Sequence, residues 1–463
     1  MNFYTLLLLF FFVAQFGLAQ SPVPERRKLS SGASTRMINE YLGHKAYQNT
    51  NKKKYEYNLP YYKKVEDGMV KLIRKGQFYD DPSLSSYVYG IKNKLTSHYE
   101  LKNEFIHVVV DKSSVVNAKA LGRCSIILNN GLLATIDSEE QLAFILSHEI
   151  AHLELDHIYQ KLILIDQDKL KSDIKRIVTT DAKLEDMESL KKEIYSFASF
   201  SRKKEREADS LGYLIYSNAY NSKEAPLEAL VKIDVSNPKH QQLGLRLFKP
   251  FHSKAAPFNE ALLREDLDIF DKEKNKVLFL DVDSIISHPE MPVRLAKLSD
   301  QISKHAKKEA VQQTRLTRLN KTSAYEVVEA SMMTNSYTKA LYSALKLKYQ
   351  FPDDKMTSTL IARVMIKIHD DKRDGLFDMS FSRYTVGYSS DLKLVHNFIR
   401  NTSYQDLAGL TYNMLGMSRN FDQGEAEHYR LLASICKRMS KDNEVSKIRY
   451  IHQDRFGKVL QLD

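Results

Sequence analysis

The sequence has only two cysteines in 463 residues, Cys124 and Cys436. Because they lie far apart, in what we expect to be different domains, they indicate no disulfide framework, and a single bridge between them stays an open alternative. Tryptophan is absent, but the 26 Tyr and 21 Phe residues and the apolar fraction of 43% are typical of a globular protein rather than a disordered one. A chain of this length can form two domains or more.

Long apolar runs are also absent beyond residue 19, where no stretch approaches the roughly 20 residues that a transmembrane helix needs. We therefore expect a soluble mature protein with at most peripheral membrane association. Residues 1–19 have the pattern of a signal peptide, because residues 6–12 form a short apolar core and Gly17-Leu18-Ala19 offers the small residues that a signal peptidase accepts. This predicts a periplasmic or secreted location. An uncleaved anchor is the alternative, and the segment before the apolar core lacks Lys and Arg.

The net charge of +11 is spread along the chain without a long basic block or a motif for binding RNA or DNA. A solvated basic surface is the first interpretation of this charge, and attraction to an anionic membrane surface is the second. We therefore expect no nucleic-acid partner.

Residues 138–152 are predicted to form a buried helix. Ser138 followed by Gln141 has the pattern of a capping box, and the two acidic residues between them suit the positive end of a helix dipole. Residues 142–146 are all apolar, which is typical of a helix that is buried on most sides. Polar side chains in such a helix have to be paired or bound to a metal ion.

This helix ends with the pattern HExxH at residues 148–152. His148 and His152 are four residues apart, so they project from one helical face and can share one ion. Neutral imidazoles suit zinc, and a catalytic zinc site combines three protein ligands with one position for water. Glu149 lies beside the pair, where it would take a proton from that water and deliver it to the leaving amine. The pattern also arises by chance, so a third ligand is required.

Two residues are candidates for the third ligand. His157 is nearer, but the pattern HExxHxxGxxH would need Gly and His where this chain has Leu155 and Ile158, and we interpret His157 as a structural histidine near the helix end. Glu205 is the better candidate. It lies four residues before Asp209 on an expected second helix, and Asp209 can accept the free ring N–H of a ligand histidine.

Two more residues of this second helix have different expected roles. Ala208 is small and would allow the two helices to approach closely, whereas Glu207 points elsewhere and is interpreted as a solvated charge. Taken alone, the stretch would be an ordinary surface helix rich in Lys and Arg. Its combination with HExxH favours the metal site.

The two motifs together resemble a known family. HExxH at residues 148–152, followed by Glu205-Arg206-Glu207-Ala208-Asp209, is similar to the HExxH…ExxAD signature of the HtpX- and BepA-like gluzincin metallopeptidases, relatives of the CAAX prenyl endopeptidase. Residues 117–120 and 131–133 resemble the family's NAxA…GLL segment. The resemblance covers about residues 60–300. The sequence departs from the family pattern at Lys119 and its neighbours up to Cys124, which bears on substrate preference more than on the chemistry.

The resemblance implies roles for two residues of the segment Ser287-His288-Pro289, with Arg294 six residues after the histidine, which is similar to the family's HPxxxxR segment. Arg294 should lie near the cleft, where a fixed cation would stabilise the oxyanion of the tetrahedral intermediate. His288 would do the same, or would occupy the open zinc position and hold the enzyme latent. A turn residue without a role is the alternative for His288.

Two short stretches rich in β-branched residues, 105–110 and 125–128, are expected to be strands. In the family the strand before the catalytic helix borders the cleft, and an extended substrate can pair with its edge. This implies substrate binding by Ser125, Ile126, Ile127 and Leu128. The alternative is that these residues only pack against the rest of the domain.

The predicted fold is α+β and mainly helical, with a gluzincin-type metallopeptidase domain that contains a small β-sheet and an all-α, repeat-like domain after it. Residues 336–352 resemble the second helix of a tetratricopeptide repeat, and an ordinary helical bundle is the alternative. The charged insertion at 159–200 is interpreted as a helical arm, with a lid over the site as the alternative. The five predicted parts are a signal peptide (1–19), a flexible segment (20–55), the metallopeptidase domain (56–300), a helical linker (301–321) and a helical, TPR-like domain (322–463).

The sequence thus predicts an endopeptidase with one Zn²⁺ per chain that acts on polypeptide substrates in the periplasm or cell envelope, in protein quality control. Its C-terminal helices would offer a surface for envelope protein partners. The alternative is a periplasmic chaperone or assembly factor whose protease site is latent or dispensable. A non-proteolytic zinc hydrolase is disfavoured by the ExxAD match.

Overall fold

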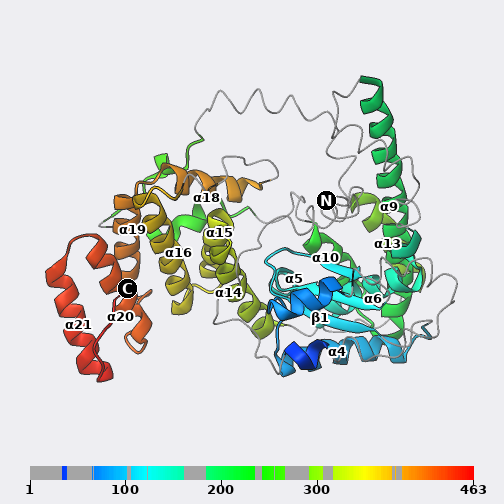
Figure 1. The fold of residues 1–463 in the computed structure, drawn as a ribbon, viewed down its shortest axis with the longest axis horizontal. Helices are drawn as coiled ribbons and strands as arrows, with labels where there is room; N and C mark the ends of the chain where they lie inside the picture. Colours follow the sequence, from blue (N-terminus) through cyan, green and yellow to red (C-terminus); the bar gives the residue numbers. More distant parts are fainter. Residues whose placement is uncertain are drawn as a thin grey trace. The chain divides into compact units, whose positions relative to one another are not determined.

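The computed structural model consists of two compact units, and Figure 1 traces the elements of both. Unit 1 comprises Met1–Val235 and Glu273–Asn320, and unit 2 comprises Ser236–Lys272 and Lys321–Asp463. The predicted signal peptide and His288 lie outside the residues that the structure describes. Of residues 184–200 the structure describes only the backbone. The described residues are 34–38, 65, 67–101, 106–121, 124–160, 184–234, 242–254, 256–265, 291–305, 316–377, 381 and 388–462.

A three-stranded sheet in unit 1 places one strand between two others. β3 (Ser125–Asn129) pairs in parallel with β1 (His107–Asp111) and antiparallel with β2 (Ala118–Leu121), so the order is β1-β3-β2. The Val- and Ile-rich strands β1 and β3 are buried along their whole length, as expected of strands covered on both faces, whereas β2 is half-buried. Both predicted strands are present with slightly shifted ends, and β2 was not predicted.

The predicted catalytic helix is α6 (Glu139–Glu154). Its N-cap Ser138 accepts a hydrogen bond from the Gln141 N–H at 3.3 Å, as the capping pattern predicts. Every residue of α6 except Glu139 and His152 is buried. The core that surrounds α6 therefore explains why residues 142–146 are all apolar.

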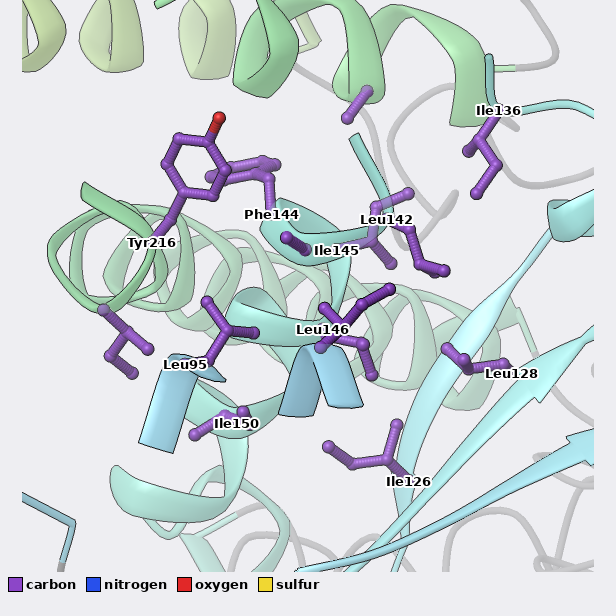
Figure 2. Close-up of a cluster of buried hydrophobic side chains, with 14 of the residues drawn as sticks. Leu95, Ile126, Leu128, Ile136, Leu142, Phe144, Ile145, Leu146, Ile150 and Tyr216 are labelled. Atoms are coloured by element: carbon purple, nitrogen blue, oxygen red, sulfur yellow. The ribbon is translucent and has the colours of Figure 1, made fainter. Parts of the chain in front are cut away.

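That core joins α6 to the sheet and to two other helices, α4 (Pro82–Ser97) and α9 (Leu184–Ala219). Figure 2 shows Leu146 of α6, Leu95 of α4 and Ile126 of β3 within this core, and Tyr216 of α9 beside Phe144. The last two rings meet edge to face, with centroids 6.0 Å apart. The metal motif is thus carried by a helix whose position is set by burial on several sides. Other helices of unit 1 include α5 (Asn130–Leu133), α10 (Glu224–Ile233) and α13 (Met291–His305), and residues 34–38, 67–74 and 157–160 are also helical.

Unit 2 is helical throughout its described residues and has a core of its own, which includes Leu341, Ile361 and Phe398. The short helix η3 (Gly244–Phe251) belongs to this unit and packs on α15 (Tyr337–Gln350), although the sequence placed it within the predicted peptidase domain. Its remaining elements are η4 (Glu260–Leu263), α14 (Thr317–Met333), which begins in unit 1, α16 (Lys355–Arg373), α18 (Ser390–Asn401), α19 (Tyr404–Gly416), α20 (Ala426–Arg438) and α21 (Asp442–Phe456).

The predicted fold class is confirmed: the described chain is mainly helical α+β, with one small sheet and a helical C-terminal region. Cys124 and Cys436 are buried in different units and are not joined by a disulfide. Within the described part of the chain, no helix combines the length and the apolar character that crossing a membrane requires.

Candidate metal centre

The site forms where helices α6 and α9 pack against each other at unusually short range. Gly212 of α9 lies against His148 of α6, and a Cβ at Gly212 would be only 2.9 Å from the His148 Cα. One turn earlier on α9, Ala208 is fully buried, in keeping with its predicted role. Two small residues therefore allow the backbones to approach, which brings Glu205 to the histidines of the other helix.

Three side chains converge there with the chemistry of a metal site. The Nε2 atoms of His148 and His152 are 3.0 Å apart, and the Glu205 carboxylate oxygens lie 3.5 Å from the first and 3.6 Å from the second. His148, His152 and Glu205 each offer a ligand atom within 4.8 Å of the others. Tetrahedral zinc with bonds of about 2.0–2.1 Å places its ligand atoms about 3.3–3.4 Å apart, so this donor set fits zinc.

The outer face of the His148 ring is held by a buried ion pair. Its Nδ1 lies 3.0 Å from Asp209, and Arg294 donates from Nε and Nη2 to the two Asp209 oxygens, each at 2.7 Å. Burial by itself raises the pKa of Asp209, but the hydrogen bonds from Arg294 and His148 outweigh it, and the pKa lies below its ordinary value. Asp209 therefore lies within ion-pair distance of the His148 ring, at the side where the sequence predicts an acceptor for the free ring N–H.

Arg294 itself has a different position from the one expected. Its side chain is only 2% exposed, and besides Asp209 it contacts Glu205, with 3.3 Å between Nη1 and Oε2. A guanidinium between two carboxylates has its charge compensated by them, so it orients Glu205 and Asp209 rather than acting as an oxyanion-binding group in an open cleft. The expected oxyanion role for Arg294 is corrected accordingly.

The outer face of the His152 ring has a partner that the sequence did not reveal. Nδ1 of His152 lies 2.9 Å from Nδ1 of His157, whose Nε2 is 3.1 Å from Glu207, and Lys204 donates to the same Glu207 oxygen at 2.7 Å. His157 reaches back to His152 because Asp156, with φ of 56°, turns the chain at the end of α6. The side chain of Glu207 is 36% exposed and is not one of the three converging ligands, but it is paired with His157 and Lys204, which its interpretation as a solvated charge did not include. The signal in the sequence was the spacing of five residues between His152 and His157.

Glu149 is held by a hydrogen bond from the sheet. Its carboxylate is buried and accepts a hydrogen bond from the Ala120 N–H of β2 at 2.6 Å. The next side chain on that strand is Lys119, and burial lowers its pKa to about 8 although the carboxylates of Asp111 and Glu149 oppose the shift. Glu149, the predicted general base, thus contacts β2 while its neighbours in sequence include the predicted ligand His148.

The strand expected to bind substrate is not at an edge. Ser125, Ile126, Ile127 and Leu128 belong to β3, which has β1 on one side and β2 on the other, and their side chains are at most 1% exposed. The backbone N–H and C=O groups of β3 are already paired with β1 and β2, so a substrate strand cannot pair with β3. The expectation for β3 is therefore corrected. β2, which contacts Glu149, is at an edge of the described sheet.

The two ligand histidines differ in their affinity for protons. Burial alone would lower the pKa of His148, but the hydrogen bonds to Asp209 and Glu205 outweigh burial and raise it to about 10. For His152 burial lowers the pKa, and the neighbouring His148 lowers it further. The cluster thus favours one positive charge between Asp209 and Glu205, which is the electrostatic environment a cation requires.

Comparisons of the sequence with known proteins find similarity to peptidases. Residues 83–302 match the model of Peptidase family M48. A stretch of 79 residues is 29% identical to the beta-barrel assembly-enhancing protease of Escherichia coli strain K12, and to that of Shigella flexneri. The stretch covers 17% of this chain and 16% of each relative. The similarity therefore spans about a sixth of the length of the curated relatives.

Proposed function

We propose that this chain, whose residues 83–302 match the model of Peptidase family M48, is a zinc-dependent endopeptidase that hydrolyses peptide bonds of protein substrates. One observation carries the proposal: His148, His152 and Glu205 offer three ligand atoms within 4.8 Å of one another. Glu149, between the two histidines in the sequence, supplies the acid–base group that amide hydrolysis needs.

Each residue of the site has a separate role in hydrolysis. Zinc bound to the three ligands would polarise the scissile carbonyl and acidify a water molecule. Glu149 takes the proton of the attacking water and delivers it to the nitrogen of the leaving amine. The Ala120 N–H keeps the Glu149 carboxylate oriented, at 2.6 Å. Asp209 and Arg294 keep the His148 ring and Glu205 in place.

We place the substrate along β2 rather than β3. β2 is at the edge of the described sheet, and its Ala120 N–H is directed to Glu149. An extended polypeptide that pairs with this edge would bring a backbone carbonyl beside the catalytic carboxylate. Main-chain pairing of this kind accepts many sequences, which suits an enzyme that acts on unfolded polypeptides.

The variant Glu149→Gln tests the chemistry. We expect it to bind zinc like the wild type, because Glu149 is not a ligand, and to cleave casein at least about 100-fold more slowly, because the acid–base group is lost. The matched control is Glu100→Gln, which changes an exposed residue after α4. Zinc is measured by elemental analysis and cleavage with and without a chelator. Wild-type turnover in Glu149→Gln would contradict the assignment.

The finer proposal is a role in protein quality control in the periplasm or cell envelope. Two observations support it: the signal-peptide pattern of residues 1–19, and the similarity to a protease whose name assigns it to beta-barrel assembly. Its substrates would then be misfolded or misassembled envelope polypeptides. Cell fractionation tests the location, and recovery of the chain in the cytoplasm would contradict it.

A chaperone or assembly factor is the second candidate, and it is favoured by the separate helical core of unit 2. A unit with its own core can present a partner-binding surface whether or not the metal site works. Complementation of a deletion strain distinguishes the two functions. If Glu149→Gln restores growth as well as the wild type does, the second candidate gains; if only the wild type restores growth, the peptidase is the function.

A further inference from the structure

We propose that His157 and Glu207 are positioning residues that hold the metal ligand His152 in its binding orientation and tautomer, an inference that rests on the proposed function. The observation is a continuous row of polar contacts: His152 Nδ1 to His157 Nδ1 at 2.9 Å, then His157 Nε2 to Glu207 at 3.1 Å. The row starts at the ring atom of His152 that faces away from the ligand cluster and ends on α9, the helix that also carries Glu205.

The tautomers of the row follow from the position of the metal. When Nε2 of His152 binds a cation, its ring proton is on Nδ1, and Nδ1–H has to donate. The atom 2.9 Å away is Nδ1 of His157, which must then be the acceptor and carry no proton. The proton of His157 is therefore on Nε2, where the Glu207 carboxylate accepts it. Each contact has one donor and one acceptor only in this arrangement.

The geometry of the two rings fits such a bond. Their centroids are 4.9 Å apart and their planes are inclined by 76°, so the rings meet at an edge and are not stacked. His157 is 4% exposed, so water competes weakly for this contact. Lys204, with 14% of its side chain exposed, holds Glu207 from the other side at 2.7 Å.

The arrangement makes the two metal-binding histidines unequal. Nδ1 of His148 lies 3.0 Å from Asp209, an anion that is itself fixed by Arg294, whereas Nδ1 of His152 faces a second imidazole. The acceptor ring of His157 contacts His152 through Nδ1 and the Glu207 carboxylate through Nε2, so the carboxylate acts on His152 only through the ring. His157 thus transmits part of the Glu207 charge to His152 and, unlike a direct carboxylate, leaves the metal centre with one fewer negative charge beside it.

The test compares zinc affinity, measured by competition with a chromophoric chelator, in full-length variants. We expect His157→Phe to weaken zinc binding about 10- to 100-fold, because the ring remains but the acceptor is lost. His157→Gln should lose less, since its amide oxygen can accept the His152 Nδ1–H. Glu207→Gln should lose about 10-fold or less, because the amide oxygen still accepts but the charge is gone. The matched controls are His98→Phe and Glu100→Gln, at exposed positions, which should bind zinc like the wild type.

Two spectroscopic readouts complement the zinc affinities, and the first of them needs no variant. In zinc-loaded wild-type protein, nitrogen NMR of the histidine rings should show His157 with its proton on Nε2 and His152 with its proton on Nδ1. The cobalt-substituted protein should also change its visible spectrum in His157→Phe and recover most of it in His157→Gln, which a loss of general packing would not produce.

The outcomes separate this inference from the proposed function. If wild-type protein binds zinc and cleaves casein, but His157→Phe binds zinc within twofold of the wild type or His157 carries its proton on Nδ1, the inference is wrong and the function stands. If the wild type binds no zinc, both are wrong. Should His157→Phe fail to fold, the tautomer in the wild type decides alone.

Discussion

The two helices that build the metal centre are held in place by different means. α6 is 16 residues long and buried on nearly every side, between the sheet, α4 and α9. α9 is 36 residues long, and its described side chains are buried along one face, with exposed residues such as Leu214 opposite. The histidines are therefore positioned by a core, whereas Glu205 is positioned by close helix contact and by Arg294. The difference predicts that the α9 side of the site is the easier one to disturb.

The largest expected effect comes from removing the cation that ties α9 to the site. Arg294→Met should destabilise the fold by about 3–5 kcal/mol, because it leaves Asp209 and Glu205 buried without compensation. Bound zinc should restore part of this loss. The control Arg363→Met removes a more exposed pair with Glu329 and should cost at most about 1 kcal/mol. Chemical denaturation with and without zinc measures both, and equal losses in the two variants would contradict the role of Arg294.

A smaller change tests the close packing of the two helices. Gly212→Ala places a Cβ 2.9 Å from the His148 Cα, a backbone atom that cannot rotate away. We expect a loss of about 1–3 kcal/mol in stability together with weaker zinc binding, because α9 has to move outward with Glu205. In Gly90→Ala, on α4, the new Cβ meets nothing within 4 Å, and the variant should gain about 0.5–1 kcal/mol. Unchanged zinc affinity in Gly212→Ala would show that Glu205 does not depend on this contact.

The pH dependence of zinc binding tests the electrostatics between the helices. In the metal-free protein the pKa of His148 is raised from 6.5 to about 10, so its proton stabilises the fold below pH 6.5, and this contribution is lost as the pH rises through about 10. Zinc has to displace that proton, so zinc affinity should rise about tenfold per pH unit between pH 6.5 and about pH 10. In Asp209→Asn the rise should level off at lower pH. A flat profile in the wild type would contradict the assignment of His148.

The smallest expected effect concerns the contact of α6 with β2. Burial lowers the pKa of Lys119 from 10.5 to about 8, so the charged form destabilises the fold at neutral pH and Lys119→Met should stabilise it by roughly 1–2 kcal/mol. Between about pH 8 and 10.5 the unfolded chain binds more protons than the folded one. The free energy of unfolding of the wild type should therefore rise with pH across this range, and the difference from Lys119→Met should shrink. Thermal unfolding at pH 7 and 10.5 measures the difference. A destabilised Lys119→Met would show that the cation contributes to the fold.

The sequence predicted the parts of the site that depend on local spacing. His148 and His152, and Glu205 and Asp209, are pairs four residues apart, and a helical repeat places each pair on one face whatever surrounds it. The cap at Ser138 follows from local chemistry in the same way.

What the sequence could not predict depends on tertiary pairing. β3 is the central strand because β2, which is only four residues long, pairs with its second edge. The residues of neither strand indicate this order. Arg294 meets Asp209 across 85 residues of chain, so only the fold decides that it is paired rather than open to substrate. The segment with η3 joined unit 2 because its apolar residues fit the core there, which composition alone does not reveal.

The central claim is that two histidines of α6 and one carboxylate of α9 bind the same zinc ion. Zinc stoichiometry and affinity in wild type, Glu205→Ala and the exposed control Glu100→Ala test it most directly. We predict one zinc per chain in the wild type and the control, and a loss of affinity of more than about 100-fold in Glu205→Ala, beyond the range for residues that only support a ligand. Full occupancy with wild-type affinity in Glu205→Ala would contradict the account.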